Sequence, residues 1–325
     1  MLLDKFSRQI DYLRISVTDR CNLRCVYCMP ECGIEEKSPA DILTYEEIGI
    51  IVNSAVSLGI NKIRITGGEP LVRKDIIKLV ASLAEIQGIK DLSLTTNGVL
   101  LERYALQLKN AGLQRINISL DTLDDAKFST ITRTGAFFPD VLRGIDAAKN
   151  AGLAVKLNVV LMEGINTEEV LNFVRFGREN ALLVRFIEFM PTLDNQERNK
   201  FMYVPSDEIS QLISSRYPLE PITGVLGNGP ARYFRLKESG NIIGFISALS
   251  CKFCRQCNRL RLTSDGFLLS CLAHTYGVDL KNRLRAGASR EEILELIKAA
   301  VSLKPKEHAM ELNKISGCMM SQVGG

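Results

Sequence analysis

The sequence predicts an α/β protein: an incomplete (βα)6 barrel over residues 1–220, and a smaller C-terminal domain over residues 221–325 that covers its open side. Between Leu13 and Glu188, short apolar runs alternate with helical patterns of ten to fifteen residues. This alternation is typical of βα units around a parallel sheet. Six prolines and glycines between 218 and 230 then form a break typical of a domain boundary. A doubly wound sheet has the same periodicity and remains the alternative.

Six strands are expected, because six apolar runs lie between turn residues. They are Leu13–Val17, Lys62–Thr66, Asp91–Thr95, Arg115–Leu120, Val155–Leu161 and Leu183–Glu188. Helical periodicity predicts helices near Thr44–Leu58, Asp75–Gln87, Leu101–Asn110, Val141–Asn150 and Glu168–Arg178. Two of these helices run into Asn-Ala-Gly-Leu, where Gly112 and Gly152 can adopt the left-handed conformation that ends a helix.

The pattern changes after Pro191. Ser206–Ser215 is expected to be a helix with Ser206 as its N-cap and Glu208 in its first turn. Two strand patterns follow, Arg232–Leu236 and Ile242–Ala248, and a last helix is expected near Arg290–Ser302.

Composition excludes several classes of protein. The 325 residues are 46% hydrophobic and 24% charged, which is ordinary for a globular protein. A net charge of +4 permits an anionic small-molecule ligand but falls short of a nucleic-acid-binding surface. No apolar run reaches the length of a membrane helix. The odd number of cysteines, nine, and a charged N-terminus argue against secreted disulfides. We expect a cytoplasmic protein with reduced thiols.

Three cysteines, Cys21, Cys25 and Cys28, follow the first predicted strand with the spacing C-x3-C-x2-C. Thiolates bind soft metals and iron–sulfur clusters, and cysteines in one loop can all reach one centre. Three ligands would leave one iron of a cubane cluster open for chemistry. The alternative is a zinc knuckle with Cys32 as the fourth ligand.

Polar or glycine-containing segments follow the other predicted strands. Because functional sites of parallel βα folds lie at the carboxyl ends of the strands, we expect these segments to face one cavity. Gly67 and Gly68 would let a ligand approach the backbone closely. The segments are Thr66–Pro70, Thr95–Gly98, Ser119–Asp121 and Glu188–Pro191.

A second cysteine set lies near the other end of the chain. It consists of Cys254, Cys257 and Cys271. Cys251 lies one C-x2-C step before Cys254 and could replace it as a ligand. Such spacing is also typical of structural zinc. However, Arg259 and Arg261 follow at once, and in a strand they would point to one face. Two cations beside a metal centre favour an anionic ligand such as a phosphate chain.

The first cysteine set, with Tyr27 before its last cysteine and with Gly67-Gly68-Glu69-Pro70 after the second strand, resembles the radical S-adenosylmethionine (SAM) superfamily. Both cysteine sets together, with Asn258-Arg259-Leu260-Arg261 and the terminal Gly324-Gly325, resemble the GTP 3′,8-cyclase family, which opens molybdenum-cofactor biosynthesis. The resemblance covers essentially the whole chain and implies a partial barrel of the radical SAM type. Cys32, Cys251 and Cys318 match no ligand of that family.

The resemblance implies two [4Fe–4S] clusters. Cys21, Cys25 and Cys28 would hold the first, whose open iron chelates S-adenosylmethionine, and one electron would then release a 5′-deoxyadenosyl radical. The second cluster, on Cys254, Cys257 and Cys271, would bind the guanine of GTP. The implied contacts to S-adenosylmethionine are Tyr27, Gly68, Ser119 and Met190.

The resemblance also implies a GTP site and a reaction. The implied substrate contacts are Arg14, Arg64, Thr95, Lys156, Arg259, Leu260 and Arg261, with Arg185 as a weaker candidate. Catalytic roles fall to the first cysteine set and to Arg259 and Arg261. Buried arginines in strands are costly unless compensated, and the alternative to a bound triphosphate is pairing with Asp19 or Glu69.

The implied reaction removes hydrogen from C3′ of the GTP ribose and joins C3′ to C8 of guanine. The product is 3′,8-cyclo-7,8-dihydroguanosine 5′-triphosphate. The terminal diglycine would reach into the site. Implied partners are GTP, S-adenosylmethionine, an electron donor, the downstream cyclic pyranopterin monophosphate synthase and a second copy of the chain in a homodimer; nucleic acid and membrane are not expected.

Two other functions fit part of the pattern. A radical SAM enzyme that modifies peptides also carries auxiliary clusters, but it usually has more auxiliary cysteines and a peptide-binding module before the barrel. The short segment before Leu13 leaves no room for such a module. A non-enzymatic zinc or iron–sulfur sensor would bind metal but would form no 5′-deoxyadenosine.

Overall fold

The computed structural model describes residues 1–325 except 36, 136, 191–202, 223–228, 274–275 and 309–325. The predictions for Cys318 and for the Gly324-Gly325 tail lie outside the described residues.

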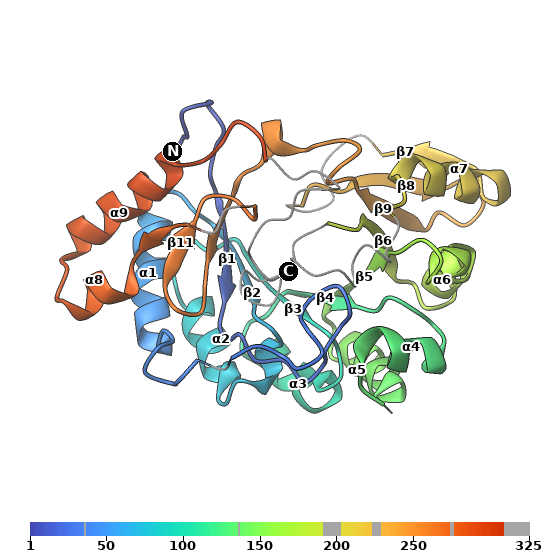
Figure 1. The fold of residues 1–325 in the computed structure, drawn as a ribbon, viewed down its shortest axis with the longest axis horizontal. Coiled ribbons are helices and arrows are strands. Elements are labelled where there is room, and N and C mark those ends of the chain that lie inside the picture. The colour runs from blue at the N-terminus through green and yellow to red at the C-terminus, as the bar shows by residue number, and fades with distance from the viewer. Residues whose placement is uncertain (36, 136, 191–202, 223–228, 274–275, 309–325) are drawn as a thin grey trace.

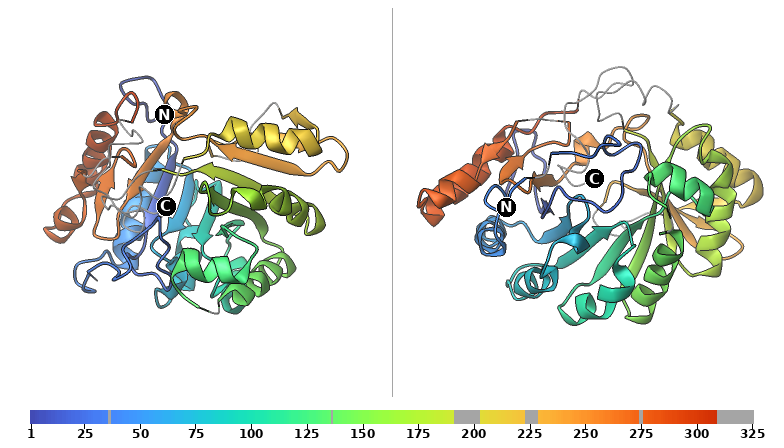
Figure 2. Two further views of the ribbon diagram at one scale, coloured as in Figure 1. Left: turned by 45° about the vertical axis from the view of Figure 1, so that its right-hand side comes forward. Right: turned by 60° about the horizontal axis from the view of Figure 1, so that its bottom comes forward.

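Six parallel strands lie side by side in chain order and form the centre of one sheet (Figure 1). They are β1 (Tyr12–Ser16), β2 (Lys62–Thr66), β3 (Asp91–Thr96), β4 (Arg115–Ser119), β5 (Ala154–Leu161) and β6 (Leu183–Glu188). Each predicted strand is confirmed. A doubly wound sheet reverses its strand order at a switch point, and the order β1–β6 does not reverse. The right-hand view of Figure 2 shows the sheet curving with helices outside, which confirms the predicted partial barrel.

Side chains alternate between the two faces of these strands. Apolar residues such as Leu13, Ile15 and Ile63 are buried in the main hydrophobic core. Arg14 and Arg64 point the other way and line a pocket on the inner side of the curve. A closed eight-stranded barrel of this kind fills its interior with branched apolar side chains. The cations inside this barrel therefore indicate space for a polar ligand.

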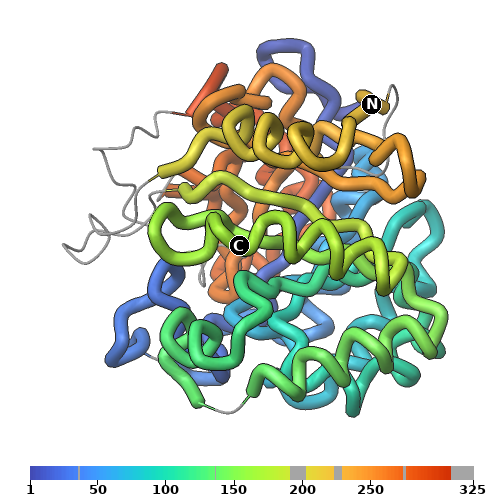
Figure 3. Tube along the Cα trace, turned by 90° about the vertical axis from the view of Figure 1, so that its right-hand side faces the viewer, coloured from blue at the N-terminus to red at the C-terminus, as the bar shows by residue number. Residues whose placement is uncertain are grey.

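Helices connect the strands, and Figure 3 shows part of the outer layer they form. They are α1 (Tyr45–Ser57), α2 (Ile76–Ala84), α3 (Leu101–Asn110), α4 (Asp125–Thr132), α5 (Phe138–Asn150) and α6 (Val170–Glu179), with short 3-10 helices η1 (Pro70–Val72) and η2 (Thr167–Glu169). All five predicted helices are confirmed, and α4 was not predicted. Gly112 and Gly152 have φ of 97° and 73°, which confirms their role after α3 and α5.

The expectation that Ser206 is an N-cap was wrong. Helix α7 (Ser206–Arg216) begins at Ser206 itself, after an extended Pro205. The Ser206 amide donates a hydrogen bond to Glu188 Oε1 at 2.9 Å. A buried carboxylate at the end of β6 thus satisfies this backbone group, and Glu208 lies in the first turn as predicted.

Strands from the last third of the chain extend both edges of the sheet. β9 (Ile242–Ile246) pairs in parallel with β6 and is followed outward by β8 (Arg232–Leu236) and β7 (Leu219–Pro221). β10 (Arg259–Leu262) pairs in parallel with β1 and is followed outward by β11 (Phe267–Leu269) and β12 (Val278–Asp279). The segment also contains η4 (Cys254–Gln256), α8 (Lys281–Arg285) and α9 (Arg290–Ser302).

The predicted strands β8 and β9 and the predicted helix α9 are confirmed. The division of the chain at residues 220 and 221 stays a prediction. None of the helices in the described part of the chain has the length and apolar character needed to cross a membrane.

Candidate active site

The loop after β1 carries the first cysteine set and packs on the diglycine segment after β2. The amide of Gly68 donates to Thr18 O at 2.7 Å, and the amide of Glu69 donates to Arg20 O at 2.8 Å. A Cβ atom on Gly68 would lie 2.3 Å from Arg20 O. The close approach that requires glycine at this position is made by the cysteine loop, and the contact of Gly68 with S-adenosylmethionine stays a prediction.

Hydrogen bonds shape this cysteine loop locally. The amide of Cys28 donates to Cys25 O at 2.9 Å, and the amide of Leu23 donates to Cys21 Sγ at 3.4 Å. Burial raises the pKa of Cys21 to about 11, and burial with the neighbouring Cys28 and Asp121 raises that of Cys25 well above its usual value. These buried thiols ionise readily only when a metal binds them.

The donor set fits an iron–sulfur cluster better than one metal ion. Within the described ranges, no three His, Cys, Asp or Glu side chains lie close enough together to hold a metal ion. A cubane cluster places each cysteine on a different iron, so it accepts thiolates that are further apart. Cys32, the fourth ligand of the zinc alternative, is exposed.

Two of the predicted cofactor residues line one small pocket. Tyr27 and Ser119 lie there with Cys25 and Asp121. The Tyr27 hydroxyl donates to Asp121 Oδ2 at 2.6 Å, and Asp121 Oδ1 accepts from the Val160 amide at 2.7 Å. The tyrosine is therefore held by a carboxylate at the end of β4. Met190, also a predicted cofactor contact, lines the larger pocket described next.

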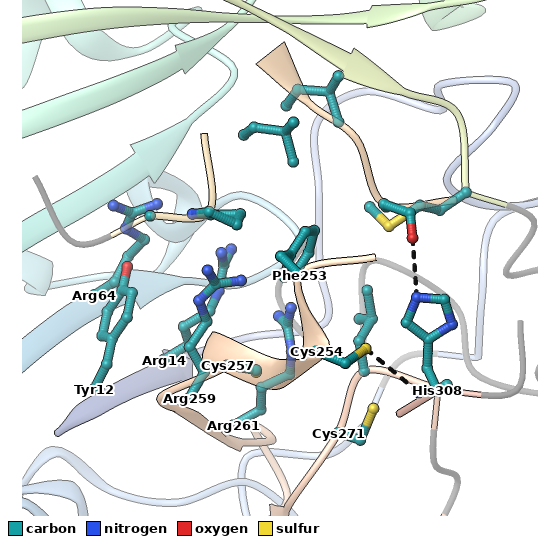
Figure 4. Close-up of a pocket in the computed structure, with 18 of the residues that line it drawn as sticks. Tyr12, Arg14, Arg64, Phe253, Cys254, Cys257, Arg259, Arg261, Cys271 and His308 are labelled. Carbon is teal, nitrogen blue, oxygen red and sulfur yellow. Dashed lines mark hydrogen bonds between the residues drawn. The ribbon is translucent and has the colours of Figure 1, made fainter. Parts of the chain in front are cut away.

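The larger pocket brings most of the predicted substrate and second-cluster residues together (Figure 4). Its lining includes Arg14, Arg64, Thr95, Arg259, Arg261, Cys254, Cys257 and Cys271. These residues come from β1, β2, β3, β10 and the segments around β10 and β11. Figure 4 shows the guanidinium group of Arg261 beside Cys254 and Cys271, with Arg14 and Arg64 further along the pocket.

The register of the sheet aligns three of the arginines. Arg14 of β1 is paired with Arg261 of β10 on one side and with Arg64 of β2 on the other. Arg64 and Arg261 are only 6% and 8% exposed. Burial and then Arg259 lower the pKa of Arg261 to about 10, and burial lowers the pKa values of Arg14 and Arg64 as well. A row of buried like charges is unfavourable without an anion.

Glu69 and Asp19, the acids considered as partners for these arginines, accept hydrogen bonds from backbone amides. Glu69 Oε1 accepts from the Leu71 amide at 3.0 Å and from Thr96 Oγ1 at 2.7 Å, while its Oε2 accepts from the Asn97 amide at 2.7 Å. Asp19 Oδ2 accepts from the Lys37 amide at 3.2 Å. Both carboxylates thus hold the loops of the rim.

The second cysteine set lies at the amino end of β10. Cys254 is buried and lines the pocket, whereas Cys251, three residues earlier, is exposed. Burial alone would raise the pKa of Cys257, but the charges of Lys304 and Arg259 lower it to about 7. A thiol with this pKa is well prepared to act as a thiolate ligand.

Two predicted substrate residues do not line this pocket. Leu260 alternates to the other face of β10 and is fully buried in the hydrophobic core, so its side chain cannot contact a ligand there. Lys156 of β5 lies with its Nζ 5.5 Å from the ring centroid of Tyr233. Burial and the neighbouring Arg185, Arg115 and Arg64 lower the pKa of Lys156 to about 8, so it belongs to the same cationic interior.

Sequence reasoning missed Tyr12 and Asn158, and gave Arg185 little weight. All three line the pocket. Among the described residues, Tyr12 Oη, Asn158 Oδ1 and Arg185 Nε are buried and have no hydrogen-bond partner. The signal was present in the sequence, because Tyr12 is two residues before Arg14 and Asn158 two after Lys156, on the same faces of their strands. Buried polar atoms aimed into a pocket fit a polar ligand.

Family comparisons agree with this geometry. Residues 15–177 match the Radical SAM superfamily, and residues 182–310 match the family Molybdenum Cofactor Synthesis C. The fold and the first cysteine set therefore define a member of the radical SAM superfamily.

The chain is 50% identical over 323 residues to "GTP 3′,8-cyclase" of Moorella thermoacetica and 50% identical over 328 residues to "GTP 3′,8-cyclase" of Thermodesulfovibrio yellowstonii, with 99% of each chain covered in both cases. It belongs to the GTP 3′,8-cyclase family. Among solved structures, Streptococcus suis SuiB bound to S-adenosylmethionine has a TM-score of 0.60 and 17% identity, covering 88% of this chain and 67% of SuiB. That likeness shows the fold alone.

Proposed function

We propose that this chain converts GTP to 3′,8-cyclo-7,8-dihydroguanosine 5′-triphosphate with S-adenosylmethionine, the first step of molybdenum-cofactor biosynthesis. One observation carries the proposal: the row Arg261, Arg14 and Arg64 and the second cysteine set line a single pocket. Cations alone would suit many phosphate ligands, and cysteines alone would suit many clusters. Together they select a nucleoside triphosphate whose base lies near a metal centre.

The arginine row binds the triphosphate. Neighbouring strands lie about 4.8 Å apart, so three aligned guanidinium groups suit several successive phosphates better than one phosphate. The bound anion also relieves the repulsion among the buried cations. Tyr12 Oη can donate to the same phosphates, because the Tyr12 ring packs 5.5 Å from Arg64 Cζ.

The two cysteine sets hold the two [4Fe–4S] clusters of the family. When bound, the first cluster with S-adenosylmethionine supplies the radical that takes the ribose hydrogen. Tyr27 and Ser119 beside Cys25 would hold this cofactor, and Asp121 fixes the tyrosine. Cys254, Cys257 and Cys271 would hold the second cluster at the base end of the nucleotide.

Apolar side chains protect the reacting atoms from water. Phe253, Ile187 and Ile246 line the same pocket as the arginines. Phe253 also packs against Arg259, whose Cζ is 5.2 Å from the ring centroid. Limiting water beside a carbon radical favours ring closure over side reactions.

The test is anaerobic reconstitution of the full chain, followed by incubation with S-adenosylmethionine, a reductant and GTP. We expect about eight irons per chain, two clusters of four, and 5′-deoxyadenosine that forms only with GTP. Cys257→Ala should lose about four irons, while the matched variant Cys251→Ala should lose none. Equal iron loss in both variants, or formation of 5′-deoxyadenosine without GTP, would contradict the proposal.

The remaining partners follow from the chemistry. Cleavage of the sulfonium consumes one electron, so an electron donor must serve the first cluster. The cyclic nucleotide triphosphate must be consumed by a downstream enzyme, which we propose to be cyclic pyranopterin monophosphate synthase. We also propose that two copies of the chain form a homodimer, which sedimentation would test.

A further inference from the structure

Lys304 is a buried lysine whose ammonium group lies between the two segments that carry Cys257 and Cys271. Only 2% of the residue is exposed. Its Nζ donates to the carbonyl of Arg259 at 2.7 Å and to the carbonyl of Ser270 at 2.8 Å. Arg259 follows Cys257 by two residues, and Ser270 directly precedes Cys271. The lysine therefore joins the two cysteine-bearing segments through their backbones.

The buried ammonium group of Lys304 needs compensation by hydrogen bonds and negative charge. Burying an ammonium group is costly unless hydrogen bonds and anions compensate it, and two carbonyls satisfy two of its three donors. Cys257 and Cys271 lie within two residues of the two carbonyls that Lys304 binds, so as thiolate ligands they would place negative charge near the ammonium group.

The rest of the Lys304 segment is anchored on the same cysteine loop. Arg8, in the N-terminal arm, donates from Nη1 to Cys254 O at 2.7 Å and from Nη2 to Pro305 O at 2.6 Å. The amide of His308 lies 3.5 Å from Cys254 Sγ, as the dashed line in Figure 4 shows. Two distant parts of the chain therefore converge on the second cysteine set and fix the position of Lys304.

We propose that Lys304 is a positioning residue for the second iron–sulfur cluster, which sets the spacing of the Cys257 and Cys271 segments and offsets the negative charge of their thiolates. This rests on the proposed function only in requiring a cluster on that cysteine set. Net charge and hydrogen bonding near the sulfurs set cluster potentials, and groups that support metal ligands typically contribute 10–100-fold to metal affinity. A reduced cluster carries one more negative charge, so a nearby cation stabilises the reduced form.

The experiment uses the full chain with Cys21, Cys25 and Cys28 replaced by alanine, so that only the second cysteine set can bind a cluster. Lys304→Gln removes the charge but keeps an amide donor, and Lys304→Met removes both. Lys306→Met is the matched control, because Lys306 lies on the same segment and is exposed. Iron and sulfide per chain and the reduction potential, followed by electron paramagnetic resonance, are measured after anaerobic reconstitution.

We expect Lys304→Gln to keep about four irons and to disfavour reduction about tenfold, a negative shift of about 59 mV for one electron. Lys304→Met should show the same shift or lose iron, and Lys306→Met should match the parent. An unchanged potential and iron content in Lys304→Gln would overturn the proposal, even if Lys304→Met fails to fold. A parent protein that binds no cluster at all would overturn both this inference and the proposed function, whereas a cluster without activity toward GTP would affect the proposed function only.

Discussion

Replacing Arg64 by methionine should weaken GTP binding and at the same time stabilise the free protein. Arg64 is 6% exposed, donates from Nε to Ser93 Oγ at 3.3 Å and, among the described residues, has no carboxylate partner. Its neighbour in the row, Arg14, is another cation. Methionine keeps much of the volume and removes the charge. The two effects have opposite signs because the cation is present for the ligand rather than for the fold.

The size of each effect follows from the burial. A charge-assisted hydrogen bond contributes roughly 1.5–3 kcal/mol, so Arg64→Met should raise the dissociation constant of GTP by about 10-fold to 150-fold at about 1.4 kcal/mol per tenfold. The affinity for guanosine, which has no phosphates, should stay the same. Removing a buried cation should raise the free energy of unfolding of the apo-protein by about 1 kcal/mol or more.

Calorimetric titration with GTP and with guanosine, and urea denaturation of the apo-protein, measure both effects. Arg115→Met is the matched control. Arg115 lies in the same interior but forms an ion pair with Asp91, with Nε 2.6 Å from Oδ1 and both side chains 13% exposed. Its replacement should lower the free energy of unfolding by about 1–3 kcal/mol. Equal losses of GTP and guanosine affinity in Arg64→Met, or a loss of stability like that of Arg115→Met, would refute the reasoning.

Four further outcomes are expected. Arg259→Ala should raise the KM for GTP about tenfold or more while iron analysis shows both clusters intact; iron loss would mean that the arginine is structural. Tyr12→Phe should weaken GTP binding in the same titration by about threefold to tenfold without lowering the free energy of unfolding. Gly68→Ala should lose about four irons, because its Cβ would displace the cysteine loop. Burial raises the pKa of Glu69 to about 7, against 4.5 for an ordinary glutamate, so the folded state binds the proton more tightly than the unfolded state. The free energy of unfolding should therefore fall as pH rises from about 4.5 to about 7. Glu69→Gln should flatten this pH dependence, as measured by urea denaturation.

Local patterns in the sequence were sufficient for the central fold. The alternation of residues in segments such as Leu13–Val17 and Lys62–Thr66 reflects one apolar face and one polar face, and each strand was found within one residue of its prediction. Helix α4 was not predicted because its two buried apolar residues, Phe128 and Ile131, give only a weak periodic pattern. Ser206 was mistaken for a cap because the group that binds its amide, Glu188, lies in a distant strand.

Most residues of the site could be predicted from the sequence, but their arrangement in space could not. Arg14, Arg64 and Arg261 were selected as phosphate ligands, yet their alignment depends on the parallel pairing of β10 with β1, which no local pattern reveals. Tyr12 and Asn158 share strand faces with Arg14 and Lys156, but they were missed because only the structure shows that their polar atoms are buried without a hydrogen-bond partner. The two glycines after β2 were noticed correctly, but only the structure shows that the neighbouring cysteine loop is what approaches them.

The pairing of β10 with β1 has a consequence for synthesis of the protein. Tyr12 pairs with Arg259, so the first strand made waits for a partner 247 residues later (259 minus 12). At 5–20 residues per second, the ribosome needs about 12–50 s to supply it. During that time the backbone N–H and C=O groups along one edge of β1 have no strand partner. Unpaired strand edges can pair with other chains and cause aggregation. The strand that brings the arginines together in the finished enzyme also makes the growing chain dependent on protection until translation is nearly complete.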